Sequence, residues 1–314
     1  MRRRPSRLVR VAATIVIAVP VVAGCEAKVY GNPPERAAPY ATVVVPQGTR
    51  APLPEAPPDE PVASFSGLQF RVQRATAAAA EAGADISVTV LDRNTGQLIS
   101  NGNNEAMPIA SVVKLFIADD LLLQVSRGKA ELSPDDRRAF AAMLRSSDDS
   151  AAEVFWNRFG GSVIVSRVIA RYGLKATSTP YNGRWFNTLS TTGDLVRYYD
   201  KLLSGSGGLP EGKADIILSN LAASTPTAPD GTVPGGVYPQ RFGIPEGLYA
   251  DRVAVKQGWF CCWNGGNWVH WSTGAVGGDR RYVMAIASMQ PTDDVTARNT
   301  ITEAVKTIFP GGRI

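Results

Sequence analysis

The stretch PIASVVKLFIADDLL, residues 108–122, places one lysine in an otherwise apolar segment. From Ser111 to Ala118, every residue except Lys114 is a serine or is apolar. Such a run predicts a largely buried helix. Burying an ammonium group is costly unless the group is paired or loses its proton. Lys114 therefore needs a partner, and Ser111 is the nearest candidate.

Ser111 and Lys114 are three positions apart, so a helix places them on one face. Apolar surroundings and the positive end of a helix dipole both lower the pKa of an amine. A neutral amine can accept the serine proton, which predicts Ser111 as a nucleophile and Lys114 as its general base. The alternative is an N-cap serine beside a solvated lysine. The S-x-x-K pattern alone does not decide, because Ser126–Lys129 also fits it at an expected helix end.

Two further short motifs follow in the chain. RSSDDSAAEVFW, which contains Ser147, begins a predicted helix, and VAVKQGW, which contains Lys256, belongs to a predicted strand. Taken singly, the first is typical of a capping serine followed by acids, and the second of a solvated strand lysine. Together and in this order, the three motifs fit the pattern S-x-x-K, S-D-N and K-T-G.

Hydrophobic periodicity predicts one α+β domain from residue 63 onward. Apolar residues at helical spacing begin at Phe65, and a hairpin of strands follows at 86–92 and 97–101. Helices are expected at 111–125, 133–145, 150–159, 162–172, 190–203 and 210–222. Three strands, at 252–260, 267–276 and 280–289, precede a last helix at 294–309 that Asp293 and Asp294 begin. The pattern predicts a five-stranded antiparallel sheet flanked by the N- and C-terminal helices, with an inserted all-α subdomain.

With these motifs on these elements, the chain resembles the penicilloyl-serine transferase superfamily, which comprises class A β-lactamases and penicillin-binding proteins. The segments VTVLDRNTGQLIS and MPIASVVKLF are similar to the first hairpin and the active-site helix of a class A enzyme. The resemblance implies a β-lactamase/transpeptidase-like fold over 63–314. We expect 63–125 and 215–314 to form its α/β part and 126–214 its helical part.

The resemblance also implies roles for particular residues. Ser111 would be acylated with Lys114 as base, and Ser147 would relay a proton to the leaving group beside Lys256. The oxyanion would lie between the backbone N–H groups of Ser111 and Trp259. Gly258 would let the substrate backbone lie against the strand.

Three departures from the family pattern bear on activity. Asp149 replaces the asparagine of S-D-N, and an ionised carboxylate cannot donate a hydrogen bond to substrate, although it can pair with Lys114 and keep it charged. Gln257 replaces the K-T-G hydroxyl with a longer donor. The loop 175–193 contains no Asp or Glu, whereas class A enzymes place there the glutamate that activates the deacylating water. General-base help is typically worth ~10²–10⁴-fold, so efficient β-lactam hydrolysis is not expected.

Histidine and cysteine offer little further chemistry. His270, the single histidine, could hold a substrate carboxylate, although a histidine packed among tryptophans is the more ordinary prediction. Cys261 and Cys262 are neighbours and either form a vicinal disulfide or stay as thiols. The flanking aromatic residues favour buried thiols. A metal site is not expected with this spacing, and no cofactor is implied.

The N-terminus predicts export and lipid anchoring. A basic start and a short apolar run form a predicted signal peptide at 1–24. The sequence Val22-Ala23-Gly24-Cys25 resembles a bacterial lipobox, which implies lipid on Cys25, the alternative being an ordinary signal peptide with a chance cysteine. Nine of the 22 prolines lie in the following segment, and 25–62 is predicted to be a tether. The expected location is the extracytoplasmic face of the cell membrane.

Charge argues against one class of partner. The signal segment holds five arginines and no acids, and removing these five from the 33 basic residues leaves 28, against 28 acidic residues. A mature charge near zero gives no electrostatic reason to expect nucleic acid.

Two functional hypotheses remain. One is an envelope acyl-enzyme protein of D,D-peptidase type that takes a peptidoglycan peptide or a β-lactam-like ligand. The other is a catalytically degenerate member that binds a ligand or partner.

Overall fold

The computed structural model describes residues 65–314. The predicted signal peptide 1–24, the lipidation site Cys25 and the tether 25–62 therefore lie outside the described residues. Within the part of the chain that is described, no helix combines the length and apolar character needed to cross a bilayer.

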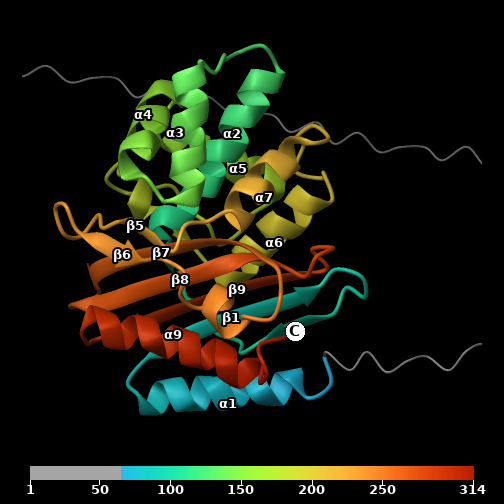
Figure 1. Ribbon diagram of the computed structural model, residues 1–314, viewed down its shortest axis with the longest axis vertical. Coiled ribbons are helices and arrows are strands. Elements are labelled where there is room, and N and C mark those ends of the chain that lie inside the picture. The colour runs from blue at the N-terminus through green and yellow to red at the C-terminus, as the bar shows by residue number, and fades with distance from the viewer. Residues whose placement is uncertain (1–64) are drawn as a thin grey trace, which may run out of the picture. The chain divides into compact units, whose positions relative to one another are not determined.

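One five-stranded sheet organises the domain, with strand order β2-β1-β9-β8-β7 (Figure 1). All four pairings are antiparallel, which confirms the predicted sheet. Its strands are β1 (Asp85–Asp92), β2 (Leu98–Ser100), β7 (Val253–Trp263), β8 (Asn267–Val276) and β9 (Tyr282–Gln290). Because β7 lies at the edge, every second backbone N–H of this strand faces away from β8.

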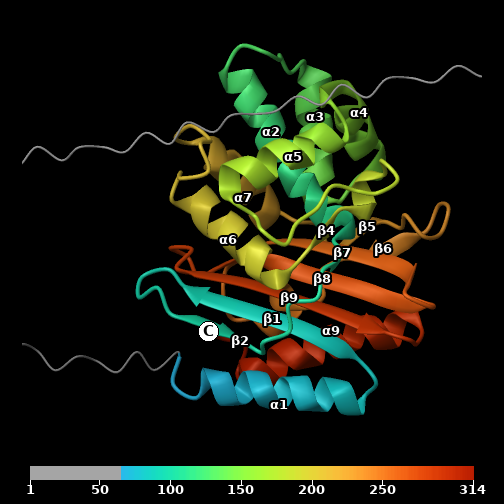
Figure 2. The ribbon, with the colours of Figure 1, turned by 180° about the vertical axis from the view of Figure 1, so that it is seen from behind.

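The first and last helices cover one face of the sheet (Figure 2). They are α1 (Leu68–Glu81) and α9 (Asp294–Ile308), and the short α8 (Ile244–Gly247) packs beside α9. The Asp293 side chain accepts a hydrogen bond from the Thr296 N–H, so the predicted start of α9 is confirmed. Buried Leu68 and Val72 of α1 and Ile301 of α9 belong to one apolar cluster with this side of the sheet.

A group of helices lies on the other side of the sheet (Figure 1). Its members are α2 (Lys114–Ser126), α3 (Pro134–Arg145), α4 (Asp149–Phe159), α5 (Ser162–Tyr172), α6 (Thr192–Leu203) and α7 (Lys213–Ala222). Of these, α6 and α7 contact the strands. Capping explains several of the ends: Ser133 and Asp136 form a capping box, and Gly160 and Gly173 end α4 and α5 in the left-handed conformation. Helices α3 to α6 fall within the predicted all-α insertion, whereas α2 and most of α7 belong to segments assigned from the sequence to the α/β part.

Several short elements escaped the sequence pattern. They are β3 (Met107–Pro108), β4 (Leu189–Ser190), β5 (Thr227–Pro229), β6 (Val237–Pro239) and the 3₁₀ turns η1 (Ala110–Val113) and η2 (Trp185–Asn187). Strands β3 and β4 pair, and the Ile109 N–H donates to the Thr188 carbonyl. The loop 175–193 is thereby fastened beside the segment that precedes Ser111.

Candidate active site

Ser111 lies in the 3₁₀ turn η1, one turn before the α-helix proper, and only 7% of its surface is exposed. The preceding residue, Ala110, has a φ of 45°, in the left-handed region that non-glycine residues rarely adopt. Such a conformation costs on the order of 1–3 kcal/mol and persists only where its surroundings impose it. The Trp271 indole N–H donates to the Pro108 carbonyl at 2.8 Å and helps to hold this segment on the sheet.

Lys114 is fully buried at the start of α2 and is surrounded by oxygen atoms. Its Nζ lies 2.9 Å from Ser111 Oγ, 2.6 Å from the Ser147 carbonyl and 2.5 Å from Asp149 Oδ1. The indole ring of Trp185 covers the same amine at 4.8 Å. The pairing of Asp149 with Lys114 that the sequence suggested is therefore confirmed, and it coexists with the Ser111–Lys114 contact.

Ser147 connects the two lysines of the site. Its Oγ is 2.8 Å from Lys256 Nζ and 3.3 Å from Lys114 Nζ. Ser147 is almost completely buried and has a φ of 55°, a second left-handed non-glycine residue at the site. The structure thus brings together all four residues predicted as catalytic, in the order Ser111, Lys114, Ser147 and Lys256.

Burial governs the titration of both lysines. It lowers the pKa of Lys114, and the negative charge of Asp149 offsets part of that effect. Burial also lowers the pKa of Lys256 well below its ordinary value, and the nearby Lys114 lowers it further. Both amines are therefore biased toward the neutral form that can accept a proton.

Gly258 is the point where strand β7 meets the segment before Ser111. A Cβ at this position would lie 2.5 Å from the Ile109 carbonyl oxygen and 3.1 Å from the Ser111 nitrogen. Only glycine allows so close an approach. The contact brings the backbone of 258–259 next to the Ser111 N–H. The backbone N–H groups of Ser111 and Trp259 were the predicted oxyanion donors.

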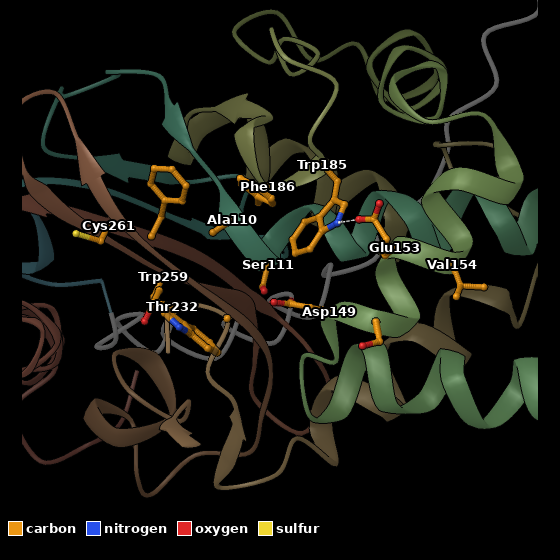
Figure 3. A pocket seen from close by; sticks show the side chains of 13 residues that line it. Ala110, Ser111, Asp149, Glu153, Val154, Trp185, Phe186, Thr232, Trp259 and Cys261 are labelled. Atoms are coloured by element: carbon orange, nitrogen blue, oxygen red, sulfur yellow. Dashed lines mark hydrogen bonds between the residues drawn. The ribbon is translucent and has the colours of Figure 1, made fainter. Parts of the chain in front are cut away.

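A cavity of about 760 Å³ opens beside Ser111 (Figure 3). Its apolar lining consists of Ala110, Val154, Trp185, Phe186, Trp259, Phe260 and Cys261. Its polar side chains are Ser111, Asp149, Ser150, Glu153 and Thr232, with Gly231 beside them. Ser111 lies in the middle of this view, between strand β7 and helix α4.

Three cavity-lining residues were not predicted from the sequence: Glu153, Trp185 and Phe186. Glu153 accepts a hydrogen bond from the Trp185 indole N–H at 3.0 Å, so an acid reaches the pocket from α4 although the loop 175–193 contains none. The spacing of four residues between Asp149 and Glu153 was the available signal, because it places both on one helix face. The two aromatic residues belong to an irregular loop whose position no periodicity indicates.

Two predicted substrate-binding residues lie away from the cavity lining. Gln257 is buried, and its Nε2 has no hydrogen-bond partner among the described residues. His270 is buried with its Nε2 2.7 Å from the Tyr238 hydroxyl, which donates to Asp294. Asp149 and Trp259 do line the cavity, and Gly258 lies behind it.

The expectation of free thiols at 261 and 262 is wrong. Cys261 and Cys262 form a vicinal disulfide. The flanking aromatic residues do not bury the pair, because the strand runs on past Phe260 to an exposed hairpin end where Cys262 is solvent-accessible and the register shifts. Cys261 lines the cavity. Within residues 65–314, no group of three or more His, Cys, Asp or Glu side chains is placed to hold a metal ion.

Comparisons with known proteins agree with this geometry. The profile of the "Beta-lactamase enzyme family" matches residues 69–139. Among solved structures, a β-lactamase from Chitinophaga pinensis has a TM-score of 0.60 at 17% identity and covers 76% of this chain and 98% of that chain. PBP-A has a TM-score of 0.62 at 17% identity, with 78% and 95% covered. Likeness at such low identity concerns the fold, and it confirms the predicted β-lactamase-like architecture.

Sequence relatives are much nearer. Proteins named "Putative lipoprotein LppW" from Mycobacterium bovis and Mycobacterium tuberculosis are each 52% identical over 323 residues, and the match covers 100% of both chains. The resemblance inferred from the three motifs is therefore confirmed at the level of family and fold. The chain belongs to the LppW family and has the fold of class A β-lactamases and penicillin-binding proteins.

Proposed function

We propose that this chain is a lipid-anchored envelope protein in which Ser111 forms an acyl-enzyme, as in penicillin-binding proteins of the D,D-peptidase type. The observation that carries the proposal is the unbroken series of contacts from Ser111 Oγ through Lys114 Nζ and Ser147 Oγ to Lys256 Nζ, at 2.9, 3.3 and 2.8 Å. The series begins at a nucleophile on the wall of a cavity and ends in the protein interior. Backbone strain at Ala110, next to the nucleophile, supports the same assignment.

The proposed chemistry is acyl transfer. Neutral Lys114 accepts the Ser111 proton while Oγ attacks the substrate carbonyl carbon, and the backbone N–H groups of Ser111 and Trp259 stabilise the oxyanion. The tetrahedral intermediate then breaks its bond to the leaving group, which takes the proton through Ser147. Lys256 donates a hydrogen bond to Ser147 Oγ and so holds this hydroxyl in place while it passes the proton on. An acyl-enzyme and a protonated leaving group result.

Deacylation is proposed to be slow. The loop 175–193 supplies no acid, and Trp185 of this loop covers the Lys114 amine. Glu153, the acid that does line the cavity, is held by the Trp185 indole N–H and by Asn157. A positioned general base is worth ~10²–10⁴-fold, so hydrolysis of a penicilloyl-enzyme should be poor.

The lipobox at Cys25 and the lipoprotein name of the LppW relatives support anchoring in the membrane, with the domain on its extracytoplasmic side. Peptidoglycan stem peptides would then be within reach of the site. A mutant of PBP-A, which shares the fold, was solved as an acyl-enzyme complex with penicillin G.

The test is intact-mass analysis after incubation with a penicillin and, separately, with an uncharged alkyl fluorophosphonate. We expect an adduct on the wild-type protein, on the peptide that contains Ser111, and none on Ser111→Ala. The fluorophosphonate reports a reactive serine whatever the charge of the natural substrate. If neither reagent forms an adduct, the proposal is overturned.

A second candidate, a ligand-binding module without catalysis, is favoured by one observation. Asp149 Oδ1 lies 2.5 Å from Lys114 Nζ and supports the charged, non-basic form of the amine. In that case penicillins would bind reversibly, leave no adduct, and bind Ser111→Ala as tightly as the wild type.

A further inference from the structure

The cavity beside Ser111 contains no basic side chain among its lining residues, all of which belong to the described part of the chain. Its charged members are both acids, Asp149 and Glu153, which stand four positions apart on α4. A substrate carboxylate placed next to Ser111 would therefore meet like charges, which disfavours its binding.

The two lysines of the site do not supply the missing cation. Lys114 is fully buried, and its oxygen partners belong to Ser111, Ser147 and Asp149. Lys256 is likewise buried and donates to Ser147 Oγ and to the Gln257 carbonyl. Neither amine lines the cavity. A carboxylate could reach them only by displacing these contacts.

The two acids differ in how their charge is balanced. Asp149 is paired with Lys114. Glu153 is exposed, and its hydrogen-bond donors are the neutral side chains of Trp185 and Asn157. No ion pair of Glu153 occurs among residues 65–314. Glu153 therefore presents a negative charge to this side of the cavity without a cation among the described residues paired to it.

The opposite side of Ser111 is mostly apolar, with Thr232 beside Trp259 (Figure 3). Trp259, Phe260 and the Cys261 end of the disulfide come from β7, and Phe186 completes the wall. The ring centroids of Phe186 and Phe260 are 6.1 Å apart. A volume of about 760 Å³ is within the range of pockets that enclose small organic ligands.

We propose that this site prefers an uncharged acyl donor, an ester or thioester with an apolar or aromatic acyl group, and that Glu153 slows, without abolishing, the reaction with carboxylate-bearing donors such as penicillins. This inference rests on the proposed function, and it narrows the substrate class. Ser111 Oγ forms a bond to the acyl carbon while the bond from that carbon to the leaving oxygen or sulfur breaks. The leaving group takes the serine proton and departs as an alcohol or thiol. Water then releases the acid and returns a proton to Ser111.

The experiment compares two thioesters that differ in one charge, S-phenylacetyl thioglycolate and the corresponding thioglycolamide. We expect kcat/KM for thiol release to be about tenfold higher for the uncharged amide, because like charges near the carbonyl destabilise binding of the acid. Equal rates, or faster release from the acid, would overturn the inference.

Binding to Ser111→Ala separates this inference from the proposed function. The amide should bind this variant more tightly than the acid in calorimetry, whether or not the wild type turns either compound over. Tighter binding of the amide with no turnover and no fluorophosphonate adduct would retain the selectivity and overturn the catalysis. Tighter binding of the acid would overturn the selectivity alone.

A charge-removing variant tests the role of Glu153. Glu153→Gln keeps an oxygen that accepts the Trp185 N–H and should raise the acid-to-amide ratio of kcat/KM about three- to tenfold. Glu131→Gln, an exposed substitution outside the cavity lining, serves as the matched control and should leave the ratio unchanged. An unchanged ratio in Glu153→Gln would contradict the assignment.

Discussion

Helix α2 carries two buried charged clusters that differ in what surrounds them. The site cluster at its beginning joins Lys114 to Ser111, Ser147 and Asp149. The Asp119 cluster, just over one turn later, joins Asp119 to Arg171, with the hydroxyls of Tyr172 and Tyr198 donating to the same carboxylate. Both clusters remove a charged group from water and satisfy it with several partners.

The difference lies in access and in backbone conformation. The Asp119 cluster joins three regular helices, and none of its four members has a positive φ. The site cluster borders a cavity and includes Ser147, whose φ is positive, while strained Ala110 precedes its serine. Burial also raises the pKa of Asp119, which lies outside the site. A buried charged group with a shifted pKa is therefore weak evidence of function by itself. Backbone strain distinguishes the site, and so does a cavity of about 760 Å³ that the serine itself lines; of the Asp119 cluster, Arg171 lines a smaller cavity of about 360 Å³.

The largest expected effect tests the activity of the site cluster. Ser111→Ala should abolish adduct formation with penicillin and with fluorophosphonate, because the nucleophilic atom is gone. Unfolding free energy should change by only about 1 kcal/mol, the usual worth of one hydrogen bond, since Lys114 keeps its other partners. Intact-mass analysis and urea unfolding measure the two quantities. A loss of stability comparable to that of a disrupted ion pair would place Ser111 among the structural groups.

The Asp119 cluster should show the reverse behaviour. Arg171→Leu leaves the Asp119 carboxylate buried without a cation and should lower the free energy of unfolding by about 3–5 kcal/mol. For a domain of this size that corresponds to roughly 10 °C in Tm. The folded fraction should still form the Ser111 adduct at a rate near that of the wild type. Arg171→Lys, which keeps the charge, should recover part of the stability, and its failure to do so would remove the electrostatic explanation.

Gly258→Ala should affect both stability and reactivity. The added Cβ would lie 2.5 Å from the Ile109 carbonyl oxygen, so the strand or the segment before Ser111 must move. We expect a loss of about 1–3 kcal/mol from overpacking and at least a tenfold fall in the rate of adduct formation, because the oxyanion donors separate. Gly278→Ala is the matched control, since a Cβ there meets only Arg252 Cδ at 4.0 Å. If Gly258→Ala is labelled at the normal rate, this contact is not needed to position the oxyanion donors.

Much of the fold could be predicted from the sequence because its signals are local. The alternation in VTVLD and the apolar stripe of Leu68 and Val72 follow directly from the strand and helix periods. The N-cap at Asp293 follows from residue type. Strands β3 and β4 have no such signal, because each is only two residues long and depends on its partner.

The site residues that stand in sequence motifs were predictable, whereas those brought in by tertiary contacts were not. Ser111, Lys114 and Ser147 stand in recognisable motifs, and the structure places them in contact. Trp185 reaches Lys114 from a loop without periodicity, so only three-dimensional packing reveals it. The disulfide of Cys261 was misjudged because aromatic neighbours in sequence do not guarantee burial at the end of a strand.

The smallest expected effect concerns the ion pair within the site cluster. Asp149 raises the pKa of Lys114 against the lowering effect of burial, so Asp149→Asn should lower that pKa further. The neutral amine then exists at lower pH, and the rising limb of the pH–rate profile for fluorophosphonate labelling should move to lower pH. An exposed or half-exposed pair is worth up to about 1 kcal/mol, which corresponds to roughly fivefold in rate on that limb. Glu131→Gln should leave the limb in place.

Asp149→Asn should favour labelling at lower pH but should lower the free energy of unfolding. Because the pKa of Lys114 is lower in the folded than in the unfolded chain, the unfolded chain binds more protons between the two values, and stability rises with pH across that window. Asp149→Asn extends the window to lower pH and should cost up to about 1 kcal/mol at pH values where the folded wild-type amine is still protonated. The difference should shrink once the pH rises above the folded-state pKa of wild-type Lys114, because the folded amine is then neutral in both proteins. A limb that moves to higher pH, or a stability difference that grows with pH, would mean that Asp149 does not control the Lys114 proton.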